Sequence, residues 1–150
     1  MAISNISAFN GVGFITASNS YITGPLENFS DDQDGINLEE IEIAAVAKTV
    51  NGEMLSWAKA GTTIYNVTIT VWPGSPSDLL LGAILSANTA TFGSQPAYDA
   101  ITLVMSFPNK VPSTYTDGVM VKASPSYSSS SEGRIKTKTY TFAFNEYDGV

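Results

Sequence analysis

The chain has 150 residues, a length that suits one domain with a hydrophobic core of its own. It contains no cysteine and no histidine, which excludes disulfide bonds, thiolate or imidazole metal sites, and the usual nucleophile and general-base pairs of enzymes. Fourteen acidic and seven basic residues give a net charge of −7, which argues against a surface that grips nucleic-acid phosphates. We therefore expect a protein that is not an enzyme and that carries no metal ion or cofactor.

Charged residues are scarce, at 14% of the chain compared with about 25% in typical soluble domains. Such a surface is easier to explain if much of it is buried between subunits, and the alternative is a monomer with a hydroxyl-rich surface. No apolar run approaches the ~18–20 residues of a membrane span, and the first residues lack the pattern of a secretory signal. We expect synthesis in the cytoplasm, without export and without membrane insertion.

The first part of the chain predicts two short strands and an acidic loop. Residues 12–16 and 20–23 read as strands, and Gly24 with Pro25 favours a turn that ends the pair. Residues 28–35, NFSDDQDG, resemble the front half of a calcium-binding loop, but their register does not supply the full set of ligands. The segment is interpreted as a solvated acidic turn.

Residues 36–58 predict a hairpin whose tight turn is Asn51-Gly52. Its first arm alternates, and one face is apolar and predicted to meet the core: Ile41, Ile43, Ala45 and Ala47. The glutamates Glu40 and Glu42 alternate with these residues. They are therefore expected to point away from the core.

The clearest strand, at residues 62–72, leads directly into the one predicted helix, at about residues 75–88. Ser75 suits the N-cap, Pro76 the first helical position, and Asp78 completes a capping-box pattern. The helix is apolar around nearly its whole circumference. Because a single sheet face cannot cover such a helix, we expect a second surface against it.

Four further segments complete the pattern. Residues 99–107 predict a strand buried on both faces, and Asp117-Gly118 precedes a short strand candidate, VMVKA. A Ser-rich stretch at 124–133 precedes a long final strand at 134–144, in which Tyr140, Phe142 and Phe144 share a face that is expected to be packed. With about eight strands and one helix, the sequence predicts a mainly β fold, an antiparallel β-sandwich or partly closed barrel with one flanking α-helix. Residues 1–150 are predicted to form a single domain.

Two segments resemble the tail tube proteins of contractile-tailed bacteriophages. These are NVTITVWPGSPSDLLLGAILSAN, at residues 66–88, and EGRIKTKTYTFAFNEYDGV, from residue 132 onward. The shared pattern is a strand running into PGSPSD, a Leu-rich helix, and a closing GR-x-K-T-K-x-Y-x-F-x-F strand. The N-terminal half is similar in layout more than in wording, so the resemblance spans most of the chain.

The resemblance implies a structural virion protein. Its subunits would form hexameric rings that stack into the hollow tail tube, through which DNA passes without specific binding and around which a sheath contracts. The implied partners are further copies of the chain, sheath, baseplate and tail terminator proteins, and the implied location is the virion tail. Two alternatives stay open: a single-ring baseplate or tail-terminator component, and a carbohydrate-binding β-sandwich module that uses its Trp and Tyr residues.

Several residues are candidates for these roles. Either Leu81 or Leu85 is expected to face a neighbouring subunit from the helix. The hairpin tip and the Ser-rich loop are expected to reach adjacent subunits, through Asn51, Gly52, Ser128, Ser129, Ser130 and Ser131. The basic residues Arg134 and Lys136 would pair with an acidic loop of another subunit. If Glu40 and Glu42 face the lumen, they would line the channel with carboxylates that repel phosphate.

Overall fold

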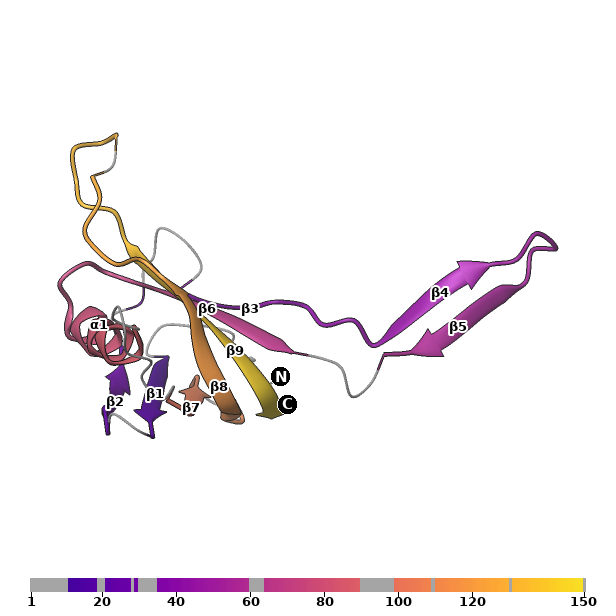
Figure 1. The fold of residues 1–150 in the computed structure, drawn as a ribbon, viewed down its shortest axis with the longest axis horizontal. Helices are drawn as coiled ribbons and strands as arrows, with labels where there is room; N and C mark the ends of the chain where they lie inside the picture. Colours follow the sequence, from indigo (N-terminus) through magenta and orange to yellow (C-terminus); the bar gives the residue numbers. More distant parts are fainter. Residues whose placement is uncertain are drawn as a thin grey trace, which may run out of the picture.

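A computed structural model describes residues 11–18, 21–27, 29, 35–59, 64–89, 99–108, 110–129 and 131–149. These residues form nine strands and one helix (Figure 1). In chain order the elements are β1 (Val12–Ala17), β2 (Thr23–Leu26), β3 (Ile36–Leu38), β4 (Ala44–Lys48), β5 (Met54–Ala58), β6 (Tyr65–Val71), α1 (Pro76–Asn88), β7 (Ile101–Ser106), β8 (Ser113–Ala123) and β9 (Lys138–Asp148).

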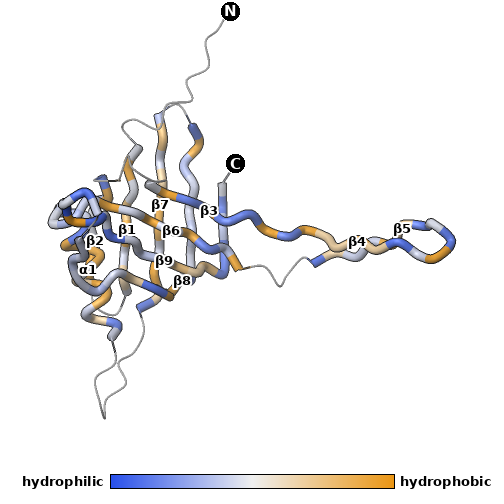
Figure 2. Tube along the Cα trace, turned by 90° about the horizontal axis from the view of Figure 1, so that it is seen from above, coloured by the Kyte–Doolittle hydropathy of each residue, from blue (hydrophilic) through white to orange (hydrophobic). Residues whose placement is uncertain are grey.

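Seven strands make one antiparallel sheet in the order β2-β1-β7-β8-β9-β6-β3. The sheet curls into a half-barrel, and α1 packs beside the β1–β2 end of the sheet (Figures 1 and 2). The remaining two strands, β4 and β5, pair only with each other in a separate two-stranded sheet. The predicted mainly β fold with one flanking helix is therefore confirmed, in its partly closed form.

The core lies between the concave side of this sheet and α1. Strand alternation points one face of each central strand inward, and the largest fully buried side chains include Tyr140, Phe142, Phe144, Ile69 and Leu103. The predicted packing of the final strand is confirmed. That strand runs to Asp148, however, while residues 134–137 belong to the loop before it.

Three expectations about strands need correction. Gly24 and Pro25 do not end the first strand pair but lie inside β2, where proline is tolerated because β2 is an edge strand of the sheet that the described residues form. Strand β7 is fully buried on only one face, since Thr102 and Val104 on the other face are partly exposed. Gly118 lies inside β8 and not in front of a strand.

The start of α1 confirms the local prediction. Ser75 is the N-cap, and its Oγ accepts a hydrogen bond from the Asp78 backbone N–H at 3.2 Å. The Asp78 carboxylate in turn accepts from the Gly74 N–H at 2.9 Å. Leu81 and Ile84 are fully buried against the sheet, whereas Leu79 is 65% exposed. The sheet therefore covers only one side of this apolar helix.

The hairpin of β4 and β5 forms as predicted, but it does not lie against the core. Ile41 is 40% exposed and Ile43 is 74% exposed, so the expected core face is wrong. The alternation is correct in the strands themselves. The described part of the chain provides no surface against which this apolar face packs.

Candidate subunit interfaces

The most prominent feature outside the half-barrel is a projecting arm, defined here as residues 39–59. Figure 1 shows it extending away from the seven-stranded sheet, with β4 and β5 as its outer part. The arm turns at its tip through Thr49 and Glu53, where the Gly52 N–H donates to the Thr49 carbonyl at 3.0 Å and the Thr49 N–H donates to the Glu53 carbonyl at 2.8 Å. Gly52 has a φ of +84°, which glycine adopts without strain. The predicted Asn51-Gly52 turn is thus confirmed.

Within β4 and β5, one face of the arm carries only apolar side chains. Residues directly opposite each other in an antiparallel pair share a face, and the pairs Ala45 with Trp57 and Ala47 with Leu55 lie on the same one. Leu55 is 53% exposed and Trp57 is 52% exposed. The opposite face mixes apolar and charged side chains, with Lys48 beside Met54. Figure 2 shows the apolar stretches continuing along the arm away from the core.

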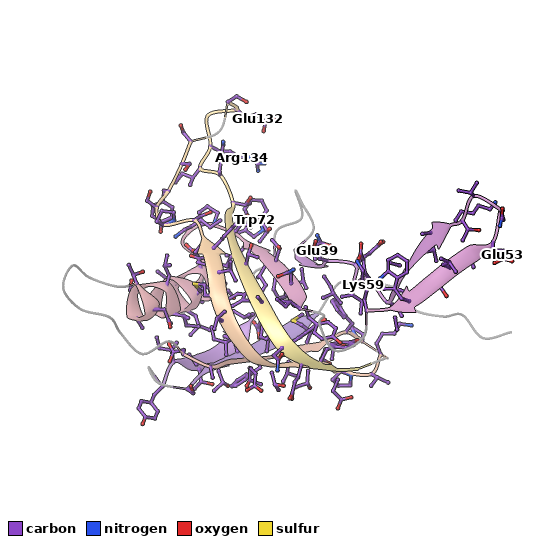
Figure 3. The ribbon with its side chains drawn as sticks, turned by 45° about the vertical axis from the view of Figure 1, so that its right-hand side comes forward. Glu39, Glu53, Lys59, Trp72, Glu132 and Arg134 are labelled. Atoms are coloured by element: carbon purple, nitrogen blue, oxygen red, sulfur yellow. The ribbon has the colours of Figure 1, made fainter. Side chains whose placement is uncertain are left out.

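The base of the arm is polar. The Glu39 carboxylate accepts a hydrogen bond from Asn66 Nδ2 at 2.9 Å, and Lys59 forms an ion pair with Glu42 (Figure 3). The hydrogen bond and the charge of Lys59 lower the pKa of the Glu42 carboxyl. A shallow hollow of about 270 Å³ lies between these residues and is also lined by Glu40, Ile41 and Ile64. The two glutamates proposed for the channel wall are therefore at the root of the arm, and both are exposed.

A second projection is the loop between β8 and β9, residues 124–137, called here the β8–β9 loop. It folds back on itself through an isolated bridge between Ser129 and Ile135, supported by the Lys136 N–H donating to the Ser128 carbonyl at 2.7 Å. Ser128, Ser129 and Ser131 are exposed, and Ser130 lies outside the described residues. The position of this predicted interface segment is thus compatible with contact to another molecule.

The β8–β9 loop and Lys138, the residue that directly follows it, contact residues 72–78 at three points. The Arg134 guanidinium lies 5.8 Å from the centre of the Trp72 ring (Figure 3), and the Tyr127 hydroxyl lies beside Gly74. The third contact is the ion pair between Lys138 Nζ and Asp78 Oδ1 at 3.2 Å. All three involve residues 72–78, so one short turn carries the contacts of the loop with the helix side of the molecule.

The ion pair at this turn is buried. The Asp78 side chain is 1% exposed and that of Lys138 is 11% exposed. Tyr140 donates a hydrogen bond from its hydroxyl to Asp78 Oδ1 at 2.8 Å, and Lys138 Nζ lies 5.1 Å from the centre of the Tyr127 ring. Burial, followed by the hydrogen bond and charge of Asp78, raises the pKa of Tyr140 well above its usual range. The pairing of Lys138 with Asp78 is not apparent from the sequence, because 60 residues separate the two partners.

The helix residues proposed for a subunit interface differ in their surroundings. Leu81 is fully buried in the core of its own subunit, which corrects its assignment to an interface. Leu85 is partly buried. The large apolar residue that does face outward is Leu79, two positions earlier than Leu81, which was not among the predicted interface residues. Helical periodicity could have found it, because Leu79 lies about 200° around the helix from Leu81.

Across the described ranges, no group of three or more acidic side chains is arranged to hold a metal ion. The acidic segment compared with a calcium loop lies mostly outside those ranges, at residues 30–34. None of the helices in the described part of the chain is both long enough and apolar enough to span a membrane.

Comparison with known proteins adds a family and a fold. The family model described as "Tail fiber protein gp32" matches residues 4–148. A search of curated proteins found no match. Among solved structures, the tube-terminating cap of the anti-feeding prophage has a TM-score of 0.58 at 12% identity, covering 100% of this chain and 95% of that chain.

Two structures from an extracellular contractile injection system are also similar. The PVC sheath/tube terminator in the extended state has a TM-score of 0.57 at 11% identity, covering 99% of this chain and 98% of that chain. The PVC sheath-tube complex has a TM-score of 0.52 at 11% identity, covering 92% of this chain and 88% of that chain. At such identities these likenesses establish a shared fold. The expected resemblance to tail tube proteins therefore holds for phage tail proteins in general and not for the tube specifically. The family match establishes that the chain belongs to the tail fiber protein gp32 family.

Proposed function

We propose that this chain is a structural subunit that forms a ring at the end of the tube in a contractile tail, as a tail terminator or cap. The fold shared with a tube-terminating cap and with a sheath/tube terminator supports this role over that of a tube subunit. The family match supports a tail component. The ring is taken to be hexameric, its neighbours are the tube and the sheath, and its site of action is the virion tail.

The uncovered apolar face of the arm is the observation that carries ring formation. Isolated two-stranded hairpins are marginally stable in water, and contiguous exposed apolar surface marks an interface. Leu55 and Trp57 therefore need a partner, and each buried Å² of their apolar area would contribute ~25 cal/mol. A neighbouring copy is the proposed partner. An arm that docks on the next subunit makes a head-to-tail interface, which closes into a ring when the rotation between copies is suitable.

Glu40 and Glu42 are proposed to form an acidic wall of the channel through the ring. Glu40 and Glu42 are exposed at the root of the arm, where a ring of copies would repeat them around its axis. Carboxylates offer DNA no counterion release, so a wall of this kind would let the phosphate backbone slide past. Changing both residues to Lys should leave rings intact and slow DNA passage in a salt-dependent way. Normal DNA ejection by particles with this double change would remove the channel role.

The ring is tested with the purified protein. Light scattering after size exclusion gives the molar mass, and electron microscopy shows the shape. The variant Leu55→Ser/Trp57→Ser should stay folded, because exposed substitutions rarely change stability by more than about 0.5 kcal/mol, and it should lose ring formation. The matched control Val46→Ser/Met54→Ser alters the other face of the same hairpin and should keep the rings. A wild-type protein that stays monomeric at high micromolar concentration would overturn the proposal.

The second candidate is a tube subunit, which the similarity to a sheath-tube complex supports. The same micrographs separate the two candidates. A terminator should give single rings, whereas a tube subunit should give stacks of indefinite length. A carbohydrate-binding module, the third class considered for this sequence, should give neither.

A further inference from the structure

The β8–β9 loop is attached to the sheet of the subunit by two hydrogen bonds at its ends. Its two ends are joined at the sheet by the Ser124 N–H, which donates to the Thr139 carbonyl at 3.0 Å, and by the Thr139 N–H, which donates to Ser124 Oγ at 3.2 Å. Beyond this point the loop leaves the sheet (Figure 1). The orientation of its outer part therefore depends on its side-chain contacts.

Those contacts converge on the first turn of α1 and the residues just before it. Arg134 lies over Trp72, Tyr127 lies against Gly74, and Lys138 pairs with Asp78. The first two are surface contacts, and an exposed cation–π pair contributes only ~0.5–1 kcal/mol. The buried ion pair is different, because removing one partner leaves the other charge without compensation in a site that excludes water.

Lys138 contacts both Asp78 and the loop residue Tyr127. It is the first residue of β9, directly after the loop, and its ammonium group contacts the Asp78 carboxylate while facing the Tyr127 ring. Asp78 is itself fixed by Tyr140 and by the Gly74 N–H. The same carboxylate thus completes the N-terminal cap of the helix and anchors the root of the loop.

We propose that Asp78 and Lys138 form a clamp that holds the β8–β9 loop in one orientation on α1, so that loop and helix present a single preformed surface. Lys138 acts here as a positioning residue. The clamp itself follows from contacts within the subunit. Its use, presenting the loop to the adjoining ring of the tail, rests on the proposed function.

Limited trypsin digestion of the full-length protein tests the clamp, with cleavage sites assigned by mass spectrometry. Arg134 lies in the loop, and its peptide bond becomes susceptible when the loop leaves the body. Lys48 lies in β4 on the arm, which the clamp does not contact, and serves as the internal reference. When opening is fast relative to cleavage, the cleavage rate follows the population of the open form.

The informative variants are Lys138→Met and Asp78→Asn. Methionine keeps an unbranched side chain beside Tyr127. Asparagine keeps one acceptor oxygen, which can accept from either Tyr140 or Gly74, the two groups that donate to different oxygens of Asp78. Each should raise cleavage after Arg134 relative to cleavage after Lys48 by roughly tenfold, the factor that corresponds to the loss of about 1.4 kcal/mol. A core variant, Ile101→Val, controls for a general loss of stability and should leave this ratio unchanged.

Two outcomes would overturn the clamp. The first is an unchanged ratio of cleavage after Arg134 to cleavage after Lys48 in both variants. The second is an equal rise of this ratio in Ile101→Val, compared with the clamp variants at matched melting temperature. Ring formation is measured separately on the same samples. If the wild-type protein forms no rings while the cleavage ratio responds as expected, the proposed function fails and the clamp stands. If rings form normally and the ratio does not respond, the clamp alone is wrong.

Discussion

The ring of Phe144 in β9 lies directly against the backbone of Gly118 in β8, with which it is paired in the sheet. A Cβ atom placed on Gly118 would come within 2.3 Å of a carbon of this ring. Phe144 in turn packs against Tyr115, with ring centres 5.4 Å apart, so it has little freedom to move away. Glycine is required here by close approach between strands.

Gly118→Ala should therefore destabilise the subunit. Overpacking of this kind typically costs 1–3 kcal/mol, and the melting temperature should fall by several degrees. Gly82→Ala is the matched comparison, because a Cβ on Gly82 would meet only the Tyr140 hydroxyl, at 3.8 Å. As a helix position, it should gain up to ~1 kcal/mol from the substitution. Equal melting temperatures for the two variants would contradict this packing analysis.

The buried tyrosines predict a loss of stability at high pH. Burial raises the pKa of the Tyr115 hydroxyl, and burial together with Asp78 raises the pKa of Tyr140. The unfolded chain releases these protons near pH 10, whereas the folded chain retains them to higher pH. Their contribution is therefore complete below about pH 10 and is lost progressively as the pH rises above it.

Chemical denaturation at pH 8, 10 and 11 measures this effect. Tyr140→Phe should be less stable than the wild-type protein by ~1–3 kcal/mol at pH 8, since Asp78 loses a hydrogen-bond donor. Its stability should then decline less steeply above pH 10. Tyr21→Phe, at an exposed position, is the control and should follow the wild-type curve. Parallel curves for Tyr140→Phe and wild type would show that this hydroxyl does not contribute.

Local chemistry made the helix and the arm turn predictable from sequence. Ser75, Pro76 and Asp78 determine the start of α1 through contacts within one turn, and Asn51-Gly52 determines the turn of the arm. Neither depends on the rest of the fold. Two features that do depend on it were not predicted: the inclusion of Pro25 in a strand, which requires knowing that β2 is an edge, and the Lys138–Asp78 pair, which requires the sheet order.

In the arm, the predicted alternation of side chains is correct, but the predicted burial in the core is wrong. Alternation in the sequence indicates which residues share a face, and Ala45 and Ala47 do share one. It does not indicate which surface covers that face. The expectation of a core assumed that the cover came from the same chain, whereas in the described residues the arm extends away from the half-barrel (Figure 1). Sequence patterning alone cannot distinguish an intramolecular core from a subunit interface.

The last prediction uses the two sides of α1 to separate folding from assembly. Leu81→Asp should unfold the subunit, because it replaces a fully buried leucine, whose burial is worth ~1.5–3 kcal/mol, with a carboxylate that has no partner in the core. Leu79→Asp should leave the fold intact, since that side chain is 65% exposed and an acidic residue near a helix N-terminus is favourable. Circular dichroism and melting temperature test this contrast.

If the outer side of α1 contacts a neighbouring copy, Leu79→Asp should also reduce ring formation in light scattering, while Ser86→Asp, farther along the exposed side, should have a smaller effect. Unchanged rings with Leu79→Asp would leave the arm as the main ring contact, and a folded Leu81→Asp subunit would contradict the placement of Leu81 in the core.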